Sequence, residues 1–267
     1  MVGRDRGVIM LKGLYTAYTG MINEQHRMDT LTNNLANAST VGFKKEGATS
    51  QSFDDILTVK IKDASYAQRL PQRMGMNNPG VKIGENYTDF TQGSYRVTGN
   101  TYDLALDGEG FFAIEFTNKA GETSTMYTRG GQFTLNREGY LVTEDGDYVL
   151  DTQSRRIRLD TLQESKIDTD GTISQNGRNI AKIQVADFED YNYLEKYGET
   201  YYRPIEGARM TQTDAQINSG YLEMANVQIV SEMVNLIAIT RAYESNQKII
   251  QTYDGSLEIA TTQLGRL

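Results

Sequence analysis

A heptad repeat near the C-terminus constrains the fold more than any other feature of the sequence. Every seventh residue from Leu222 is apolar or aromatic, and a companion series repeats three residues further on. Together they form an a/d seam of about seven heptads, which predicts a helix that pairs with another helix. The alternative is an ordinary amphipathic helix on a globular core, but such helices average about 11–12 residues. The seam residues are Leu222, Ile229, Leu236, Ile239, Tyr243, Asn246, Ile250, Tyr253, Leu257 and Leu264.

A shorter seam of the same kind lies near the N-terminus and predicts a helix of about 28 residues. Its glycines and asparagines each lower helix propensity by up to about 1 kcal/mol, so the helix is marginal alone. Burying a Leu or Met side chain stabilises by roughly 1.5–3 kcal/mol. We therefore expect the two terminal helices to pair as a coiled coil. The N-terminal seam residues are Leu14, Met21, Met28, Leu31 and Leu35.

The N-terminal helix is predicted to stop within residues 37–42. Short polar side chains there compete for backbone hydrogen bonds, and Gly42 can adopt the left-handed conformation that ends helices. Phe43 is expected to anchor the turn, and Lys44 and Lys45 to complement the negative C-terminal end of the helix. Upstream amides are predicted to bridge neighbouring chains; they belong to Asn33, Asn34 and Asn37.

The region between the helices predicts a β-rich domain. Short apolar runs alternate with turn signals such as Asp107-Gly108, as in chains of β-hairpins. A polar stretch with Pro71 and the sequence NNPG predicts an extended arm or linker. The fold class is thus α+β, mainly β in the middle. The predicted domains are an extension at 1–9 with Met10 as an alternative start, a helical domain of 10–45 with 217–267, the arm at 46–80, and the β domain at 81–216.

Composition argues against several classes of function. The chain has no cysteine and one histidine, His26, which excludes thiolate metal sites, thiol nucleophiles and poly-histidine sites. A net charge of −8 without a basic stripe argues against nucleic acid as a partner. No apolar run is long enough for membrane insertion, and no cleavable leader is recognisable, so if the protein leaves the cytoplasm we expect a route that does not cleave a leader.

Stretches that look like catalytic or binding motifs are incomplete. The Gly-x-Gly pair at 108–110 lacks the third glycine and the helix of a phosphate cradle. The Asp-x-Asp pairs at 145–147 and 168–170 lack the remaining ligands of a calcium loop. Glycoside hydrolysis needs a pair of carboxylates, and three candidates for such a pair occur close together in the sequence. No aromatic platform that could bind a sugar accompanies them. We expect no enzymatic activity, no cofactor and no metal; the three carboxylates are Asp103, Asp107 and Glu109.

The two chain ends carry motifs that resemble a known family. NNLANASTVGFKK at 33–45 resembles the signature of bacterial flagellar rod, hook and hook-junction proteins, typically Asn-Asn-x-Ala-Asn-x-x-Thr-x-Gly-[Phe/Tyr]-Lys. GYLEMANVQIVSEMVNLIAITRAYESNQ at 220–247 is similar to the other end of that family, although Thr240 replaces the usual Gln and Ala225 the usual Ser. The matching positions include Asn33, Asn34, Ala36, Asn37, Thr40, Gly42, Phe43 and Lys44 at one end, and Glu223, Asn226, Glu232, Arg241, Ala242, Glu244 and Asn246 at the other.

The resemblance implies a non-catalytic subunit of the flagellar basal-body rod. Such subunits polymerise into a hollow helical shaft that transmits torque from motor to hook and surrounds the export channel. Implied partners are further copies of the chain, other rod and hook proteins, and the flagellar export apparatus. The implied location is outside the cytoplasmic membrane, in the periplasm and cell wall, without a cleaved signal peptide.

Chain length and the arm at 46–80 favour a distal rod protein among these relatives, with a proximal rod protein as the alternative. A function of a different class is a β-rich surface-binding module oligomerised by its helical ends. That module would form discrete oligomers and carry a ligand site on its β domain. An enzyme ranks third.

Overall fold

The chain folds into two compact units, each built from segments that lie far apart in the sequence. The computed structural model describes residues 3–60, 72–118, 121–211 and 213–264. Both helical ends belong to unit 1, and most strands belong to unit 2. The predicted α+β class with helical ends and a β-rich middle is confirmed. Unit 1 comprises Met1–Leu35, Glu46–Thr88 and Ile229–Leu267, and unit 2 comprises Ala36–Lys45 and Asp89–Gln228.

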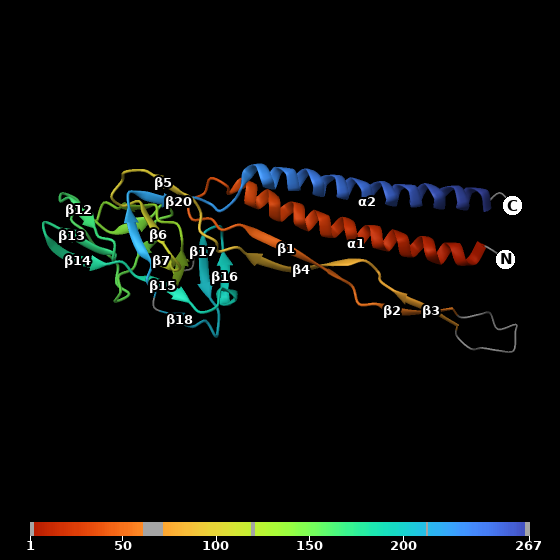
Figure 1. Ribbon diagram of the computed structural model, residues 1–267, viewed down its shortest axis with the longest axis horizontal. Coiled ribbons are helices and arrows are strands. Elements are labelled where there is room, and N and C mark those ends of the chain that lie inside the picture. The colour runs from red at the N-terminus through yellow and green to blue at the C-terminus, as the bar shows by residue number, and fades with distance from the viewer. Residues whose placement is uncertain (1–2, 61–71, 119–120, 212, 265–267) are drawn as a thin grey trace. The chain divides into compact units, whose positions relative to one another are not determined.

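Two long helices form the frame of unit 1. α1 (Gly3–Ala36) and α2 (Ile229–Leu264) have 34 and 36 residues, about three times the average for globular proteins. They lie side by side and run in opposite directions (Figure 1). α1 begins within the segment 1–9 that the sequence sets apart as an extension. Among the described residues, no helix combines the length and apolar character needed to cross a bilayer.

The first heptad predicted for the C-terminal helix is wrong, because Leu222 is not helical. It lies in β20 (Tyr221–Glu223), which pairs antiparallel with β5 (Tyr95–Val97). Its side chain is 1% exposed within unit 2. Sequence periodicity does not reveal this pairing, because the partner strand lies far earlier in the chain and tertiary pairing overrides a local helical pattern. The helix therefore begins one heptad later, at Ile229.

Residues 46–88 form antiparallel ribbons in unit 1, where the sequence predicts an arm or linker at 46–80. β1 pairs with β4 through a register shift between Ala48 and Ser50, and β2 pairs with β3. Residues 81–88, predicted as part of the β domain, are β4 of unit 1. Residues 61–71 of the predicted arm lie outside the described part of the chain. The strands are β1 (Glu46–Ser52), β2 (Ile56–Lys60), β3 (Gln72–Asn77) and β4 (Val81–Thr88).

Unit 2 consists of one large sheet, whose strands differ in length, and several smaller sheets. The large sheet runs in the order β16-β17-β8-β7-β11-β10-β9; β15 also pairs with β7, and β18 pairs with β15. β12-β13-β14 and β6-β19 are separate sheets. The elements are β6 (Leu104–Asp107), β7 (Phe111–Thr117), β8 (Thr123–Thr128), β9 (Phe133–Leu135), β10 (Leu141–Thr143), β11 (Tyr148–Val149), β12 (Ser165–Ile167), β13 (Thr172–Gln175), β14 (Arg178–Lys182), β15 (Val185–Phe188), η1 (Tyr191–Tyr193), β16 (Leu194–Tyr197), β17 (Tyr201–Pro204), β18 (Met210–Thr211) and β19 (Gln216–Ser219).

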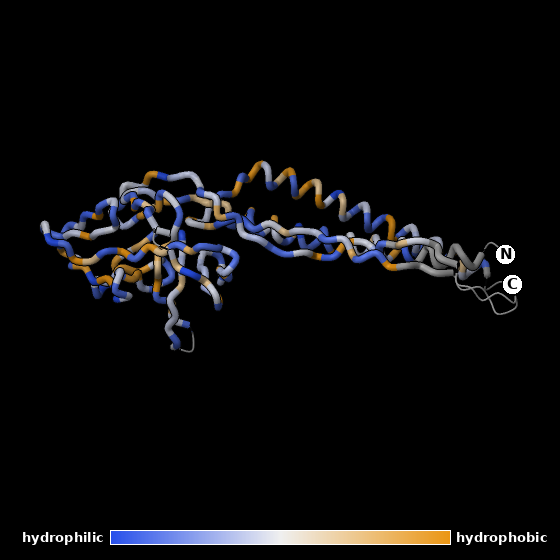
Figure 2. Tube along the Cα trace, turned by 60° about the horizontal axis from the view of Figure 1, so that its bottom comes forward, coloured by the Kyte–Doolittle hydropathy of each residue, from blue (hydrophilic) through white to orange (hydrophobic). Residues whose placement is uncertain are grey.

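The core of unit 2 lies on both faces of β7. Successive strand residues point to opposite faces, and Phe111 and Phe112 are both fully buried. Phe112 packs in a cluster with Leu104, whereas Phe111 packs in another with Tyr202. A strand buried on both faces reads as a continuous apolar run, which is why FFAI shows no alternation. Apolar residues are gathered inside unit 2 in Figure 2.

Candidate assembly surfaces

Two glycines of α1 leave room for polar side chains of α2. A Cβ at Gly13 would lie 2.3 Å from Tyr253 Oη, and a Cβ at Gly20 would lie 3.1 Å from Asn246 Nδ2. Each pair is seven residues from the next on both helices, in opposite order, so the helices are antiparallel and in heptad register. Close packing thus explains two glycines in a helix whose propensity they lower.

The less exposed side chains of α2 recur at intervals of three and four residues. Ile239 and Glu232 are 5% and 6% exposed. Ile229, predicted on the seam, is the first residue of α2 and is 50% exposed. The surroundings of the Leu264 side chain lie outside the described residues. The half-buried members of the series are Leu236, Tyr243, Asn246, Ile250, Tyr253 and Leu257.

α1 buries small and polar residues more completely than its predicted apolar seam. Ala17, Asn23, Thr30 and Asn34 are at most 8% exposed. Sequence reasoning missed Asn23 and Thr30 and named Asn34 only for its motif, although the spacing of seven and four residues between the three is itself a heptad signal. The predicted seam residues are half-buried; they are Leu14, Met21, Met28, Leu31 and Leu35.

α1 contacts the β1–β4 ribbon in addition to α2. This second contact explains why polar residues of α1 are more buried than its predicted apolar seam. The Asn34 side chain donates to the Glu46 carbonyl at 2.7 Å and accepts from the Glu46 N–H at 2.9 Å. Further along, His26 Nε2 and Asn86 Oδ1 are 2.9 Å apart. The amide of Asn34 was predicted to bridge neighbouring chains. That prediction is corrected, because both of its polar atoms bind the backbone of its own chain.

Replacing Gly255 by alanine is expected to stabilise unit 1 by about 0.5–1 kcal/mol. Gly255 lies inside α2, and a Cβ there would have no atom within 4 Å, so the substitution gains helix propensity without a clash. Thermal unfolding followed by circular dichroism would measure the gain. Gly13→Ala is the matched control, because its Cβ meets Tyr253 and the gain should be lost. Equal effects of both substitutions would contradict the close packing of α1 on α2.

Four apolar side chains form an exposed strip on α2. Val230, Met233, Val234 and Ile237 are 77%, 49%, 60% and 54% exposed. Their spacing places them on one face of the helix, and the buried Ile239 lies on the opposite face. This apolar strip of α2 thus faces away from the side that packs on α1.

The signature turn that follows α1 is held by the other end of the chain. Gly42 has φ of +70°, as predicted, although it lies six residues past the last helical residue. Its N–H donates to the Glu223 carbonyl at 2.8 Å, and a Cβ on it would lie 2.2 Å from Gly130 N. Phe43 is fully buried. The Lys45 N–H donates to Asn226 Oδ1 at 2.8 Å.

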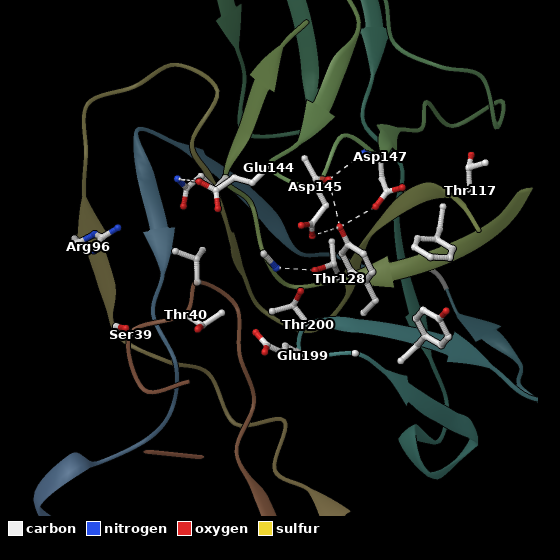
Figure 3. Close-up of a pocket in the computed structure, with 18 residues that line it drawn as sticks. Ser39, Thr40, Arg96, Thr117, Thr128, Glu144, Asp145, Asp147, Glu199 and Thr200 are labelled. Atoms are coloured by element: carbon white, nitrogen blue, oxygen red, sulfur yellow. Dashed lines mark hydrogen bonds between the residues drawn. The ribbon is translucent and has the colours of Figure 1, made fainter. Parts of the chain in front are cut away.

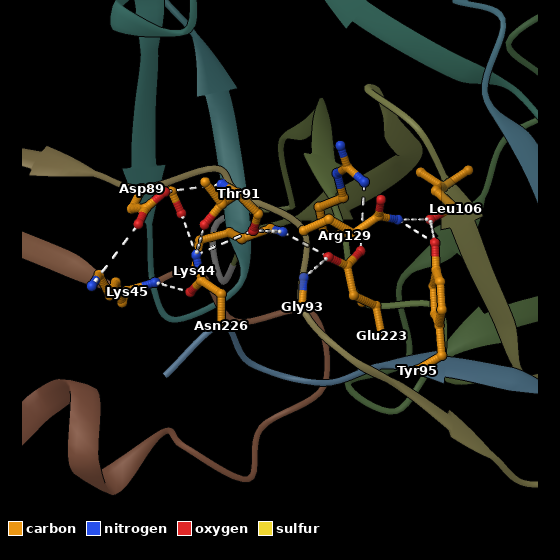
Figure 4. Close-up of polar contacts among 12 residues, drawn as sticks. Lys44, Lys45, Asp89, Thr91, Gly93, Tyr95, Leu106, Arg129, Glu223 and Asn226 are labelled. Atoms are coloured by element: carbon orange, nitrogen blue, oxygen red, sulfur yellow. Dashed lines mark hydrogen bonds and ion pairs between the residues drawn. The ribbon is translucent and has the colours of Figure 1, made fainter. Parts of the chain in front are cut away.

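A buried charge cluster lies beside this turn (Figure 4). Lys44 Nζ is 2.7 Å from Glu223 Oε1, and Arg129 Nη1 is 3.5 Å from Glu223 Oε2. The three side chains are at most 4% exposed. Lys44 also donates to the Thr91 carbonyl, and the Gly93 N–H donates to Glu223. Burial lowers the pKa of Lys44, while the Glu223 carboxylate acts in the opposite direction. The prediction that Lys44 complements the end of α1 is wrong, because its charge is neutralised by Glu223 instead.

An open polar cavity of about 750 Å³ lies in unit 2 (Figure 3). The turn between β10 and β11 contributes Glu144, Asp145 and Asp147, and the turn between β16 and β17 contributes Glu199. The Tyr201 hydroxyl lies 3.0 Å from an oxygen of both Asp145 and Asp147. Two carboxylates of this acidic cavity thus share one phenol, and Glu144 and Glu199 line the same cavity.

Replacing Asp147 by asparagine is expected to raise the free energy of unfolding at neutral pH. Burial raises the pKa of Asp147, the Tyr201 hydrogen bond opposes this, and Asp145 adds to it. A carboxyl with a raised folded pKa stabilises at low pH, and that stability is lost as pH rises through the folded pKa. The gain from Asp147→Asn should thus disappear below the ordinary pKa of 3.8. Urea unfolding at several pH values would measure it. The exposed Asp168→Asn serves as the control, and a pH-independent gain would contradict the assignment.

The remaining signature residues do not form one site. Within the described parts of the chain, no three His, Cys, Asp or Glu side chains gather as metal ligands would. Thr40 is half-buried in the signature turn, and Asn37 is buried. Exposed signature positions are Asn33, Ala36, Arg241, Ala242 and Glu244.

Three family models match the chain, at its two ends and in its middle. The model described as flagella basal body rod protein matches residues 14–44, which are α1 and the signature turn. The flagellar hook protein FlgE/F/G D1 domain matches 105–175 in unit 2. The flagellar basal body rod FlgEFG protein C-terminal model matches 218–264, which includes Glu223 and α2.

Curated relatives match over nearly the whole length. Flagellar basal-body rod protein FlgF of Caulobacter vibrioides is 35% identical over 264 residues, covering 97% of this chain and 98% of the relative. Flagellar basal-body rod protein FlgG of Bacillus subtilis is 34% identical over 270 residues, covering 93% and 97%. Flagellar hook-basal body complex protein FlhO of Bacillus subtilis is 32% identical over 272 residues, covering 97% and 100%. These matches confirm the resemblance carried by the sequence motifs, and the chain belongs to the flagellar basal-body rod protein family.

Proposed function

We propose that this chain is a structural, non-catalytic subunit that polymerises with further copies of itself into the hollow helical shaft of the rod. The observation that carries the proposal is the apolar strip of α2, whose four side chains are about half or more exposed in a single chain. Monomeric soluble proteins rarely leave large contiguous apolar patches uncovered. A second copy that packs on this strip would bury apolar surface at roughly 25 cal/mol per Å².

Within each subunit, α1 and α2 act as an antiparallel coiled coil that presents the strip. The heptad spacing of Ile239, Tyr243 and Asn246, and the fit of Asn246 against Gly20, support this. Pairing inside the chain leaves the opposite face of α2 for neighbouring subunits. Head-to-tail contacts of this kind do not close on themselves and generate a helical filament.

The polymer lies in the periplasm and cell wall, between the motor and the hook, where a stiff shaft transmits torque. Its further partners are other rod and hook proteins and the flagellar export apparatus, which delivers the subunit. The named relatives are rod and hook-basal body proteins, which supports this environment. We propose a distal position in the rod, supported by the ribbons formed by residues 46–88. A proximal position is the second candidate, since the FlgF and FlgG relatives are almost equally identical.

Replacing Val234 by aspartate tests the apolar strip. We expect the purified full chain to lose sedimentable filaments, because an unpaired carboxylate would be buried between subunits. The variant's thermal unfolding should match the parent's, because Val234 is 60% exposed in the single chain. Asn235→Asp is the matched control, since it adds the same charge at an exposed position of the same helix turn that lies off the strip. Filaments of normal length from Val234→Asp would overturn this role for the strip.

The rival of a β-rich surface-binding module makes a different prediction for the same experiment. A surface-binding module predicts discrete oligomers of fixed size in sedimentation velocity experiments at every protein concentration. A helical shaft expects open-ended growth above a critical concentration, with filaments visible by electron microscopy. Discrete oligomers alone would overturn the polymer proposal.

A further inference from the structure

Two cavities of opposite charge lie at the two ends of β10 in unit 2. The turn after β10 borders the acidic cavity, and the turn before β10 borders a second cavity of about 880 Å³. This basic cavity is lined by Arg137, Arg158 and Arg178, with Glu138 and Asp160 as its acidic members. The β13–β14 hairpin that carries Arg178 lies at the far end of unit 2 from the β16–β17 hairpin of the acidic cavity (Figure 1). The unit is therefore electrostatically polar from end to end.

Within the part of the chain that the structure describes, the charged groups of both cavities form no ion pair. Among described residues, no ion pair involves the four carboxylates of the acidic cavity, and Arg96 is the cation in its wall. Arg137 and Arg178 likewise form no ion pair with described residues, and both are exposed. Arg158 lies over the Tyr140 ring and donates to the Glu138 carbonyl. Charges of one sign that are left unpaired in a concave site attract the opposite charge from another molecule.

We propose that the turns bearing Arg137 and Arg178 of one copy insert into the acidic cavity of the next copy. Guanidinium groups suit this cavity, because they pair with carboxylates in a forked geometry and stack on aromatic rings. The cavity offers both: Glu144 and Glu199 supply carboxylates, and Phe116 supplies an aromatic ring. The contact uses two different surfaces, so it repeats without closing and stacks unit 2 of successive subunits. This inference rests on the proposed polymerisation and names a second interface for it.

Charge reversal at each end of unit 2, in the full chain, tests the contact. One variant carries Arg137→Glu with Arg178→Glu, and the other carries Glu144→Lys with Glu199→Lys. Asp145 and Asp147 are left unchanged because they hold Tyr201. Each variant alone should need at least about tenfold more protein to form filaments, since like charges then face each other. Lys166→Glu is the control, because Lys166 is exposed in β12 and lines neither cavity.

The decisive measurement mixes the two assembly-defective variants. In the mixture, each reversed end meets a reversed partner, so filament formation should return towards the level of the parent and weaken with added salt. The four-substitution chain should assemble alone for the same reason. Variants that assemble like the parent, or a mixture that stays unassembled, overturn this contact while leaving the helix-based polymer intact. A parent chain that never forms filaments overturns the polymer proposal itself. Circular dichroism of each variant verifies that unit 2 is folded.

Discussion

Replacing Glu223 by glutamine is expected to lower the free energy of unfolding of unit 2 by about 3–5 kcal/mol. The carboxylate is fully buried and lies between Lys44 Nζ, at 2.7 Å, and Arg129 Nη1, at 3.5 Å. The substitution keeps the shape and one acceptor, so the Gly93 N–H retains a partner. The two buried cations would, however, lose the carboxylate that they share, with only the weaker attraction of Asp89 left for Lys44, and a buried charge that loses its partner is strongly destabilising. Urea unfolding monitored by tyrosine fluorescence would measure the loss.

Two companion variants isolate the cause of that loss. Adding Lys44→Met to Glu223→Gln removes one of the orphaned charges, so the double variant should be more stable than Glu223→Gln alone. Glu195→Gln is the control for losing an ion pair in general, because its pair with Arg203 is about half exposed on both sides. Exposed pairs contribute about 0–1 kcal/mol. A loss for Glu223→Gln no larger than that of Glu195→Gln would contradict the role of the buried cluster.

Replacing Gly42 by alanine is expected to destabilise unit 2 by at least about 2 kcal/mol. The backbone at Gly42 has φ of +70°, which alone disfavours an L-residue by roughly 1–2 kcal/mol. The added Cβ would also lie 2.2 Å from Gly130 N, a backbone atom that has no rotamer to move away. The chain would have to shift the turn, and with it the hydrogen bond from Gly42 to the Glu223 carbonyl.

Gly177→Ala separates the two contributions. Gly177 has φ of +75°, close to that of Gly42, but its Cβ position has no atom within 4 Å. Gly177→Ala should therefore lower the free energy of unfolding only by the conformational contribution, about 1–2 kcal/mol. The excess seen for Gly42→Ala measures the close approach to Gly130. Equal losses at the two positions would mean that the signature turn relaxes without consequence.

Both of these predictions concern the place where the two ends of the chain meet in unit 2. Gly42, Lys44 and Lys45 come from the N-terminal motif, while Glu223 and Asn226 come from the C-terminal motif. The two motifs look like separate helix features in the sequence. In the fold they form one buried contact in unit 2, whose strands come from residues 89–228. The motif residues near this contact are therefore explained by packing inside the subunit.

The sequence predicted the elements that depend on local pattern. A heptad spacing repeated over many turns is a local pattern of a long helix, so Ile239, Tyr243 and Asn246 predicted α2 without a structure. Alternating apolar runs with turn residues indicated a β-rich middle for the same local reason. The motifs at 33–45 and 220–247 then identified the family, which the comparisons confirmed.

Only the tertiary structure decided which pattern prevails where two compete. Leu222 continues a heptad, yet burial and pairing with β5 make it a strand residue. Lys44 suits the end of a helix, yet it is buried against Glu223. Asn34 resembles a free polar residue, yet it binds the backbone of β1. In each case the deciding partner is distant in the sequence, and the free energy of burial and hydrogen bonding with that partner exceeds the small local preference of about 1 kcal/mol or less per residue.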